Sequence, residues 1–150
     1  MALSNSLSSV EALKHVLADS YVLLVKVQNV HWNVEGQTFI AIHKLLDELY
    51  EDLGESIDVI AERIRALGEN SPAAMSEFVA LSRLEEFTSS QKDIRQGVEA
   101  LVHDYEQMSY LMLEHIEVLE KDNDAGTIDL LTDRIRAVDH FAWLLRSNLD

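Results

Sequence analysis

The sequence predicts an all-α fold, a four-helix bundle whose second and third helices are joined by a long connection. Only five glycines and one proline interrupt its 150 residues, and 47% of the side chains are hydrophobic, which is enough to build a core. Hydrophobic residues recur every three or four positions in four separate stretches, the spacing that one buried helix face requires. Since no repeat or shift in composition divides the chain, we expect a single domain over residues 1–150.

The first two stretches predict a helical hairpin. The first helix is expected over residues 8–34, because Ser8 and Glu11 have the spacing of a capping box. Gly36 ends this helix, and the second helix is expected over residues 38–68. The apolar stripe of the second helix is Ile42, Leu46, Leu49, Leu53, Ile57, Ile60, Ile64 and Leu67.

A long polar connection separates this hairpin from a second one. Residues 69–90 contain an Asn-Ser-Pro turn and one short helix, expected over 76–82. The third helix is expected to start at Thr88 or Ser90, and the fourth follows the acidic break at 121–124. Two hairpins joined by one long crossover are a known connectivity of four-helix bundles.

The chain is strongly acidic and lacks cysteine. Its 27 acidic and 12 basic residues give a formal net charge of −15, so its surface should repel nucleic acid and anionic lipid and attract cations. Without cysteine, disulfides, zinc–thiolate sites and iron–sulfur clusters are excluded, and any metal must be held by His, Asp and Glu. Those ligands suit iron or manganese.

No segment has the composition of a secretion signal or a membrane span. Residues 1–10 have neither a basic nor an apolar region, and the longest aliphatic and aromatic run is only residues 21–25. We therefore expect a cytoplasmic protein that does not enter a membrane.

The second predicted helix carries two pairs of metal-ligating residues. His43 and Asp47 are four residues apart, as are Asp58 and Glu62, so each pair lies on one helix face. Eleven residues separate Asp47 from Asp58, which is about 16 Å along a helix. Because the metals of a dinuclear site lie about 3.5–4 Å apart, the two pairs can share one centre only if they come from different chains.

An antiparallel pair of these helices would bring the two halves together. A dyad near residues 52–54 places His43 and Asp47 of one copy opposite Asp58 and Glu62 of the other, twice per dimer. His31, at the end of the first helix, can join the first pair. The intrasubunit alternative needs Glu-x-x-His motifs, and the sequence has none. The competing interpretation is that these residues are solvated surface charges and a structural histidine.

Several segments of the chain carry a family resemblance. They are Asn29–Gly36, Phe39, His43, Leu46–Tyr50 and Asp58–Ile64, together with Thr127–Thr132 and Ala142–Arg146. These segments resemble the signature of the Dps family of mini-ferritins, in the ferritin-like superfamily, with the specific spacing His-x11-His-x3-Asp-x10-Asp-x3-Glu. The likeness covers nearly the whole chain.

The resemblance implies a ferritin-like bundle and a ferroxidase activity. Proteins of this family form a hollow homododecamer that oxidises Fe(II) with hydrogen peroxide or dioxygen, stores ferric mineral and limits oxidative damage. The resemblance assigns the ligand positions of the family to this sequence. It implies that His31, His43 and Asp47 come from one subunit and Asp58 and Glu62 from the subunit related by the dyad, and that together they hold two iron ions.

Residues outside the ligand set are assigned other roles. Trp32, beside a ligand, is interpreted as an electron donor, with a packed aromatic as the alternative. Asp122, Asp124, Asp129 and Asp133 are interpreted as the lining of a three-fold iron-entry pore, against a solvated helix junction with an N-cap aspartate. The histidines that match no ligand spacing are assigned structural or surface roles: His15, His103, His115 and His140.

Direct binding to DNA is not expected, although many members of the family bind it through a Lys-rich tail. Lys14 is the first basic residue, none follows Arg146, and twelve copies at −15 would carry about −180 charges. The alternatives are a DNA-binding cage that compacts the nucleoid and a purely structural helical oligomer.

Overall fold

Four long helices form the protein, and a short fifth one lies in the connection between the two hairpins. The computed structural model describes residues 2–150, with side chains from Ser8 onward. Its elements are α1 (Ala2–Asn33), α2 (Phe39–Ala66), α3 (Met75–Leu81), α4 (Ile94–Leu119), the 3-10 turn η1 (Glu120–Asp122) and α5 (Ala125–Arg146). The predicted all-α, ferritin-like architecture with a short helix in the long connection is confirmed.

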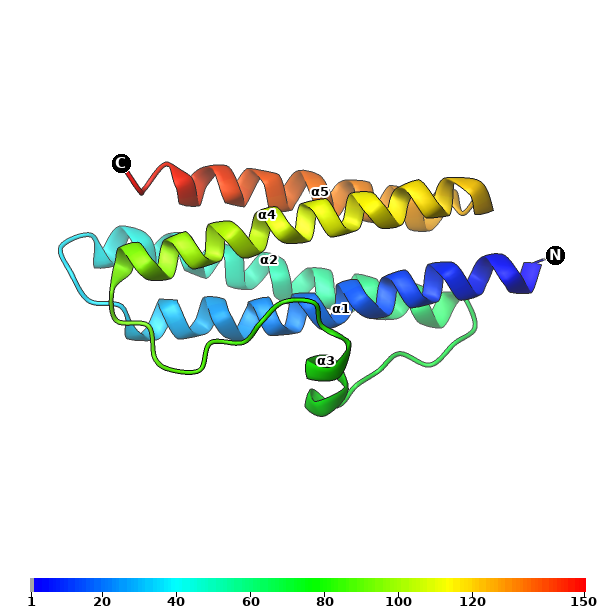
Figure 1. Ribbon diagram of the computed structural model, residues 1–150, viewed down its shortest axis with the longest axis horizontal. Helices are drawn as coiled ribbons and strands as arrows, with labels where there is room; N and C mark the ends of the chain where they lie inside the picture. The colour runs from blue at the N-terminus through cyan, green and yellow to red at the C-terminus, as the bar shows by residue number, and fades with distance from the viewer. Residues whose placement is uncertain (1) are drawn as a thin grey trace.

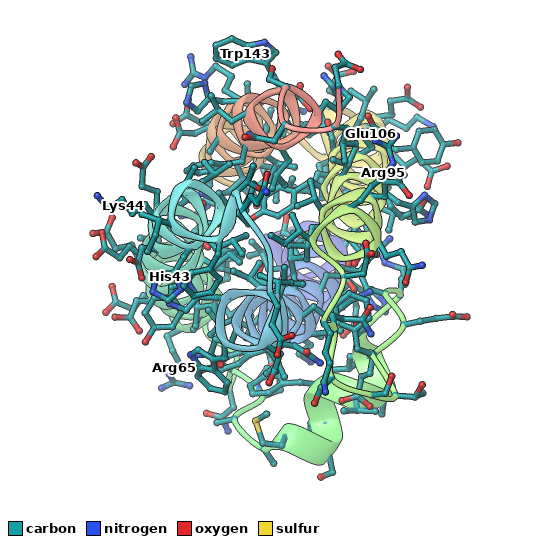
Figure 2. All side chains as sticks on the ribbon, turned by 90° about the vertical axis from the view of Figure 1, so that its left-hand side faces the viewer. His43, Lys44, Arg65, Arg95, Glu106 and Trp143 are labelled. Atoms are coloured by element: carbon teal, nitrogen blue, oxygen red, sulfur yellow. The ribbon has the colours of Figure 1, made fainter. Side chains whose placement is uncertain are left out.

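The helices pack as two antiparallel hairpins, α1 with α2 and α4 with α5 (Figure 1). Viewed end-on, the four helices surround a common core, and the segment carrying α3 lies outside α1 (Figure 2). We call residues 67–93, between α2 and α4, the crossover. None of the helices that the structure describes is both long and apolar enough to pass through a lipid bilayer.

The predicted apolar stripes form the core. Along α2, every residue of the expected stripe from Ile42 to Ile64 is buried, and only Leu67, which caps the helix, is half-buried. The largest side chain that is fully buried is Tyr105 of α4, in the centre of the bundle. Burying such a stripe on each helix is the main driving force for this arrangement.

Two of the predicted helix starts are wrong. The first helix begins at Ala2, six residues before Ser8, so Ser8 lies inside the helix and is not its cap. The neighbouring Ser9 is fully buried, and its hydroxyl donates to Asp124, the cap of α5.

The helix expected from Thr88 or Ser90 begins instead at Ile94. Its cap is Asp93, whose carboxylate accepts a hydrogen bond from the amide of Gln96 at 2.8 Å. The polar residues before it stay in the crossover, because the Asn29 side chain binds the Ser89 carbonyl at 3.0 Å and the Gln91 amide at 2.9 Å.

A row of polar side chains on α1 holds the crossover. His15 contacts the Leu81 carbonyl at 2.9 Å, and Asp19 accepts hydrogen bonds from the Arg83 amide at 2.6 Å and its guanidinium at 3.1 Å. Further along, Lys26 donates to the Glu85 carbonyl at 2.7 Å. The crossover is therefore fixed on α1 mainly through its own backbone.

Lys26 also forms a buried ion pair with Asp104 of α4. The two charged groups are 2.5 Å apart, and each side chain is only 7% exposed. Burial raises the pKa of the Asp104 carboxyl, although the hydrogen bond and charge of Lys26 oppose that effect. Such a pair is expensive to break by removing one partner, since the other charge stays buried and uncompensated.

Replacing Lys26 by methionine should therefore destabilise the protein by about 3–5 kcal/mol. The double variant Lys26→Met with Asp104→Leu should recover most of that loss, because it removes both charges. Urea unfolding of the wild type and both variants measures the effect. Equal stability of the single and double variants would contradict this account.

Candidate metal centre

The turn between α1 and α2 brings two histidines together. His31 lies in the last turn of α1 and His43 in the second turn of α2. Gly36 makes the connection with φ of +146°, a region that residues with a Cβ rarely adopt, and a Cβ there would lie 3.2 Å from Ile94 Cδ1. A glycine at this position therefore permits the sharp return.

The two histidines hold each other through reciprocal hydrogen bonds. His31 Nδ1 lies 3.0 Å from the His43 carbonyl, and His43 Nδ1 lies 2.9 Å from the His31 carbonyl. The rings stack with centroids 3.8 Å apart. Since a carbonyl oxygen can only accept, both Nδ1 atoms must carry a proton. In the neutral rings Nε2 then presents the lone pair, which is the form that binds a metal.

Asp47 completes a group of three ligands. Its carboxylate lies 3.2 Å from His31 Nε2, and its side chain is 54% exposed, so the group opens toward solvent. One ligand atom from each of His31, His43 and Asp47 lies within 4.8 Å of the others. Among the residues that the structure describes, no other three His, Asp or Glu side chains meet this criterion. We call these three residues the half-site; it lies on the outer flank of the bundle, where His43 is labelled in Figure 2.

The second predicted pair lies elsewhere on the same helix. Asp58 and Glu62 are both exposed on α2 and do not join the half-site within one chain. This separation follows from the rise of about 1.5 Å per residue over the eleven residues from Asp47 to Asp58. Within a single chain the half-site has three ligands and one open side.

Trp32 is adjacent to His31 but points outward. Its side chain is 67% exposed, so the packed-aromatic interpretation does not hold within a single chain. An indole exposed to this extent is available for redox chemistry or for contact with another molecule.

The predicted pore residues do not form one cluster of free carboxylates. Asp124 caps α5 by accepting from the Thr127 amide at 3.1 Å, and it pairs with Arg63 at 2.8 Å. Burial alone would raise the pKa of Asp124, but hydrogen bonds from Ser9 and Thr127 and the charge of Arg63 outweigh it and hold the pKa below its usual range. Asp129 is exposed and Asp122 half-exposed. The pore stays a prediction, and Asp124 is the least available member.

Sequence reasoning missed the partners of Asp124. Arg63 lies so close to Gly126 that a Cβ there would be 2.8 Å from its guanidinium, so this glycine makes room for the ion pair. The only signal in the sequence was an aspartate followed three residues later by a threonine, which indicated the cap but not the ion pair.

Positive charge on the surface is largely neutralised. Eight of the twelve basic side chains form ion pairs with carboxylates in the described chain: Lys14, Lys26, Arg63, Arg83, Arg95, Arg134, Arg136 and Arg146. The other four, Lys44, Arg65, Lys92 and Lys121, form no salt bridge within the part of the chain whose side chains are described.

Comparison with known proteins first defines the class. The sequence matches the family model of the ferritin-like domain over residues 10–150. A four-helix bundle with a long crossover and a His and carboxylate ligand group on its flank agrees with that class.

The more specific relatives then define the family. The chain is 35% identical to "DNA protection during starvation protein 2" of Bacillus anthracis, over 94% of this chain and 96% of that protein. It is 38% identical to a low temperature-induced protein of Nostoc, over 94% of this chain and 79% of that protein. The Dps crystal structure from Vibrio cholerae O1, described as a ferritin-like diiron-carboxylate protein, is similar with a TM-score of 0.92 at 28% identity, covering 98% and 92% of the two chains. This chain belongs to the Dps family of the ferritin-like superfamily.

Replacing Gly36 by alanine should destabilise the protein by about 1–3 kcal/mol, because the backbone there is in a conformation that a Cβ disfavours. It should also weaken cobalt binding to the half-site, since His31 and His43 are aligned by this turn. Urea unfolding and the visible spectrum of bound Co(II) measure the two effects. The neighbouring exposed change Gln37→Ala serves as a control and should alter neither, and a Gly36→Ala variant indistinguishable from that control would refute the role of the turn.

Proposed function

We propose that this chain is a ferroxidase subunit that oxidises Fe(II) at sites shared between two copies and stores the ferric product inside a cage of twelve copies. The observation that carries the proposal is the half-site, in which two imidazoles are fixed through Nδ1 and lie beside an exposed carboxylate. Membership of a family with ferritin-like diiron-carboxylate proteins supports iron as the metal.

A partner copy is needed to complete the site. Asp58 and Glu62 are solvent-exposed and too far along α2 to reach the half-site of their own chain. A dyad near residues 52–54 would bring them to the half-site of an antiparallel neighbour. Tyr50 and Val59, on either side of that dyad, are 43% and 54% exposed, and such apolar side chains favour a protein partner.

Iron is the substrate and the cargo of this reaction. The imidazoles and Asp47 would hold one Fe(II), and the partner's carboxylates would complete the coordination and hold a second. Two Fe(II) ions supply the two electrons that convert one hydrogen peroxide and two protons into two waters. Delivering both electrons together avoids hydroxyl radical. Exposed Trp32 would donate a further electron when only one iron is bound.

The charge of the chain supports delivery of iron and argues against contact with DNA. A net charge of −15 concentrates cations, and the exposed Asp129 is a carboxylate that could line an entry pore. Relatives are named for DNA protection; we propose that protection by this chain acts through removal of iron and peroxide.

Alanine at both Asp58 and Glu62 should slow Fe(II) oxidation by peroxide more than about 100-fold, since even substitutions outside the ligand set cost about 10–100-fold at metal sites. Stopped-flow absorbance of the assembled protein measures the rate. The variant Glu51→Ala with Glu55→Ala removes two exposed carboxylates from the same helix and should keep nearly full activity. Equal rates of Fe(II) oxidation in the two double variants would contradict the proposed ligand set.

Mixing two inactive variants tests whether the site is shared. Subunits with His31→Ala and His43→Ala, reassembled in equal amounts with subunits carrying Asp58→Ala and Glu62→Ala, should recover about a quarter of the wild-type activity, because random pairing restores one site in each mixed dimer. No recovery, with normal assembly by size, would place the site within one chain.

Direct association with DNA should be undetectable by gel shift at low salt with metal chelated, because a cage of this charge repels phosphate. Retardation of plasmid under those conditions would favour the DNA-binding alternative.

A further inference from the structure

Two histidines without a metal-binding pattern meet where the crossover passes between α1 and α4. The rings of His15, from α1, and His115, from α4, stack with centroids 6.1 Å apart and an interplanar angle of 12°. His15 Nδ1 contacts the Leu81 carbonyl of the crossover at 2.9 Å. The Arg83 and Asp19 ion pair lies against the same junction.

Among the described side chains, one buried carboxylate, that of Asp19, lies at this junction. Asp19 is 1% exposed, and it already accepts from the Ser82 hydroxyl at 2.9 Å and from the Arg83 amide and guanidinium. Its negative charge is therefore matched by Arg83. The remaining acidic group near His115 is Glu114, which is exposed on α4.

The polar atoms of the junction are not all satisfied. His115 Nε2 is buried and has no hydrogen-bond partner in the described chain, and the same holds for Arg83 Nε. A proton added to the His115 ring would place a second cation beside Arg83 and the His15 ring. No further buried carboxylate is available to compensate it, so the closed arrangement opposes protonation.

We propose that His115 is an acid-sensitive latch for the crossover: protonation of its ring drives Leu81 and Arg83 away from α1 and releases the α3 end of the crossover, residues 75–86.

The direction of the effect follows from linkage. With the crossover closed, burial and the charges of Arg83 and His15 lower the pKa of His115 to about 4. An imidazole reached by water titrates near 6.5, so the open state binds the proton more tightly. Above about pH 6.5 both states are neutral and this group has no effect. Between about pH 6.5 and pH 4, each unit of acidification should raise the ratio of open to closed up to about tenfold.

The release is local because other anchors do not depend on this group. Lys26 and Asn29 hold the later part of the crossover by separate contacts. At the α3 end, Phe78 is buried and stacks on Tyr21 with ring centroids 4.1 Å apart. Opening would expose this aromatic pair, so the acid form should present new apolar surface while the four-helix core stays intact.

Hydrogen exchange of the assembled full chain, followed by mass spectrometry, tests the latch. Wild type and His115→Gln are compared at the same pH, about 7 and about 4.5, so that the intrinsic chemistry of exchange cancels. At the lower pH, peptides within 75–86 should exchange about tenfold or more faster in the wild type than in His115→Gln, and equally at the higher pH. The control His140→Gln, an exposed histidine of α5, should behave as the wild type. Equal exchange in wild type and His115→Gln at both pH values would overturn the proposal.

The unmodified protein provides a second measurement if His115→Gln fails to assemble. After correction for intrinsic rates, the protection of residues 75–86 should fall by up to about tenfold per pH unit below about pH 6.5, while α4 peptides keep theirs. Parallel loss of protection in both regions would show global acid unfolding and reject the latch.

Discussion

Reciprocal hydrogen bonds between His31 and His43 are the contact on which the candidate metal centre depends. Each ring is held by the backbone of the other residue, so the end of α1 and the start of α2 are fixed in register. In the neutral rings the same bonds place the proton on Nδ1 and leave Nε2 to bind a metal, with His31 Nε2 3.2 Å from Asp47. Backbone geometry and ligand chemistry are therefore set by one pair of contacts, made possible by the turn at Gly36.

The rest of the molecule keeps that contact in place through two kinds of interaction, apolar packing and polar contacts. Apolar stripes hold the four helices together, while the crossover is held by polar side chains on α1 and by its own buried Phe78 and Leu84. The buried ion pair of Lys26 and Asp104 joins α1 to α4, and Lys26 also donates to the Glu85 carbonyl of the crossover. Buried charge at this position favours a single arrangement of these segments. That arrangement is then sensitive to the protonation of neighbouring groups.

The sequence predicted the structure well where residues recur with the regular period of a helix. The stripe of α2 predicted that helix almost to the residue, and the four-residue spacing of His43 and Asp47 predicted that they share a face. The predicted starts of α1 and α4 are wrong where neighbouring residues are engaged by distant partners: Ser9 donates to Asp124, and Asn29 binds the Ser89 carbonyl and the Gln91 amide. The ion pair of Arg63 and the stacking of His15 on His115 left no signal for the same reason: each joins segments far apart in the chain, and no local pattern records such contacts.

Four of the five ligands of the proposed shared centre lie on α2, so the length of this helix between them sets the geometry of the centre. One residue inserted between Asp47 and Asp58 would turn the second pair by about 100° relative to the first and shift it by about 1.5 Å. Because a dyad would use the same spacing twice, a single such insertion would spoil two centres together. The segment between Asp47 and Asp58 is therefore constrained in length, in addition to the burial that Leu49, Leu53 and Ile57 require.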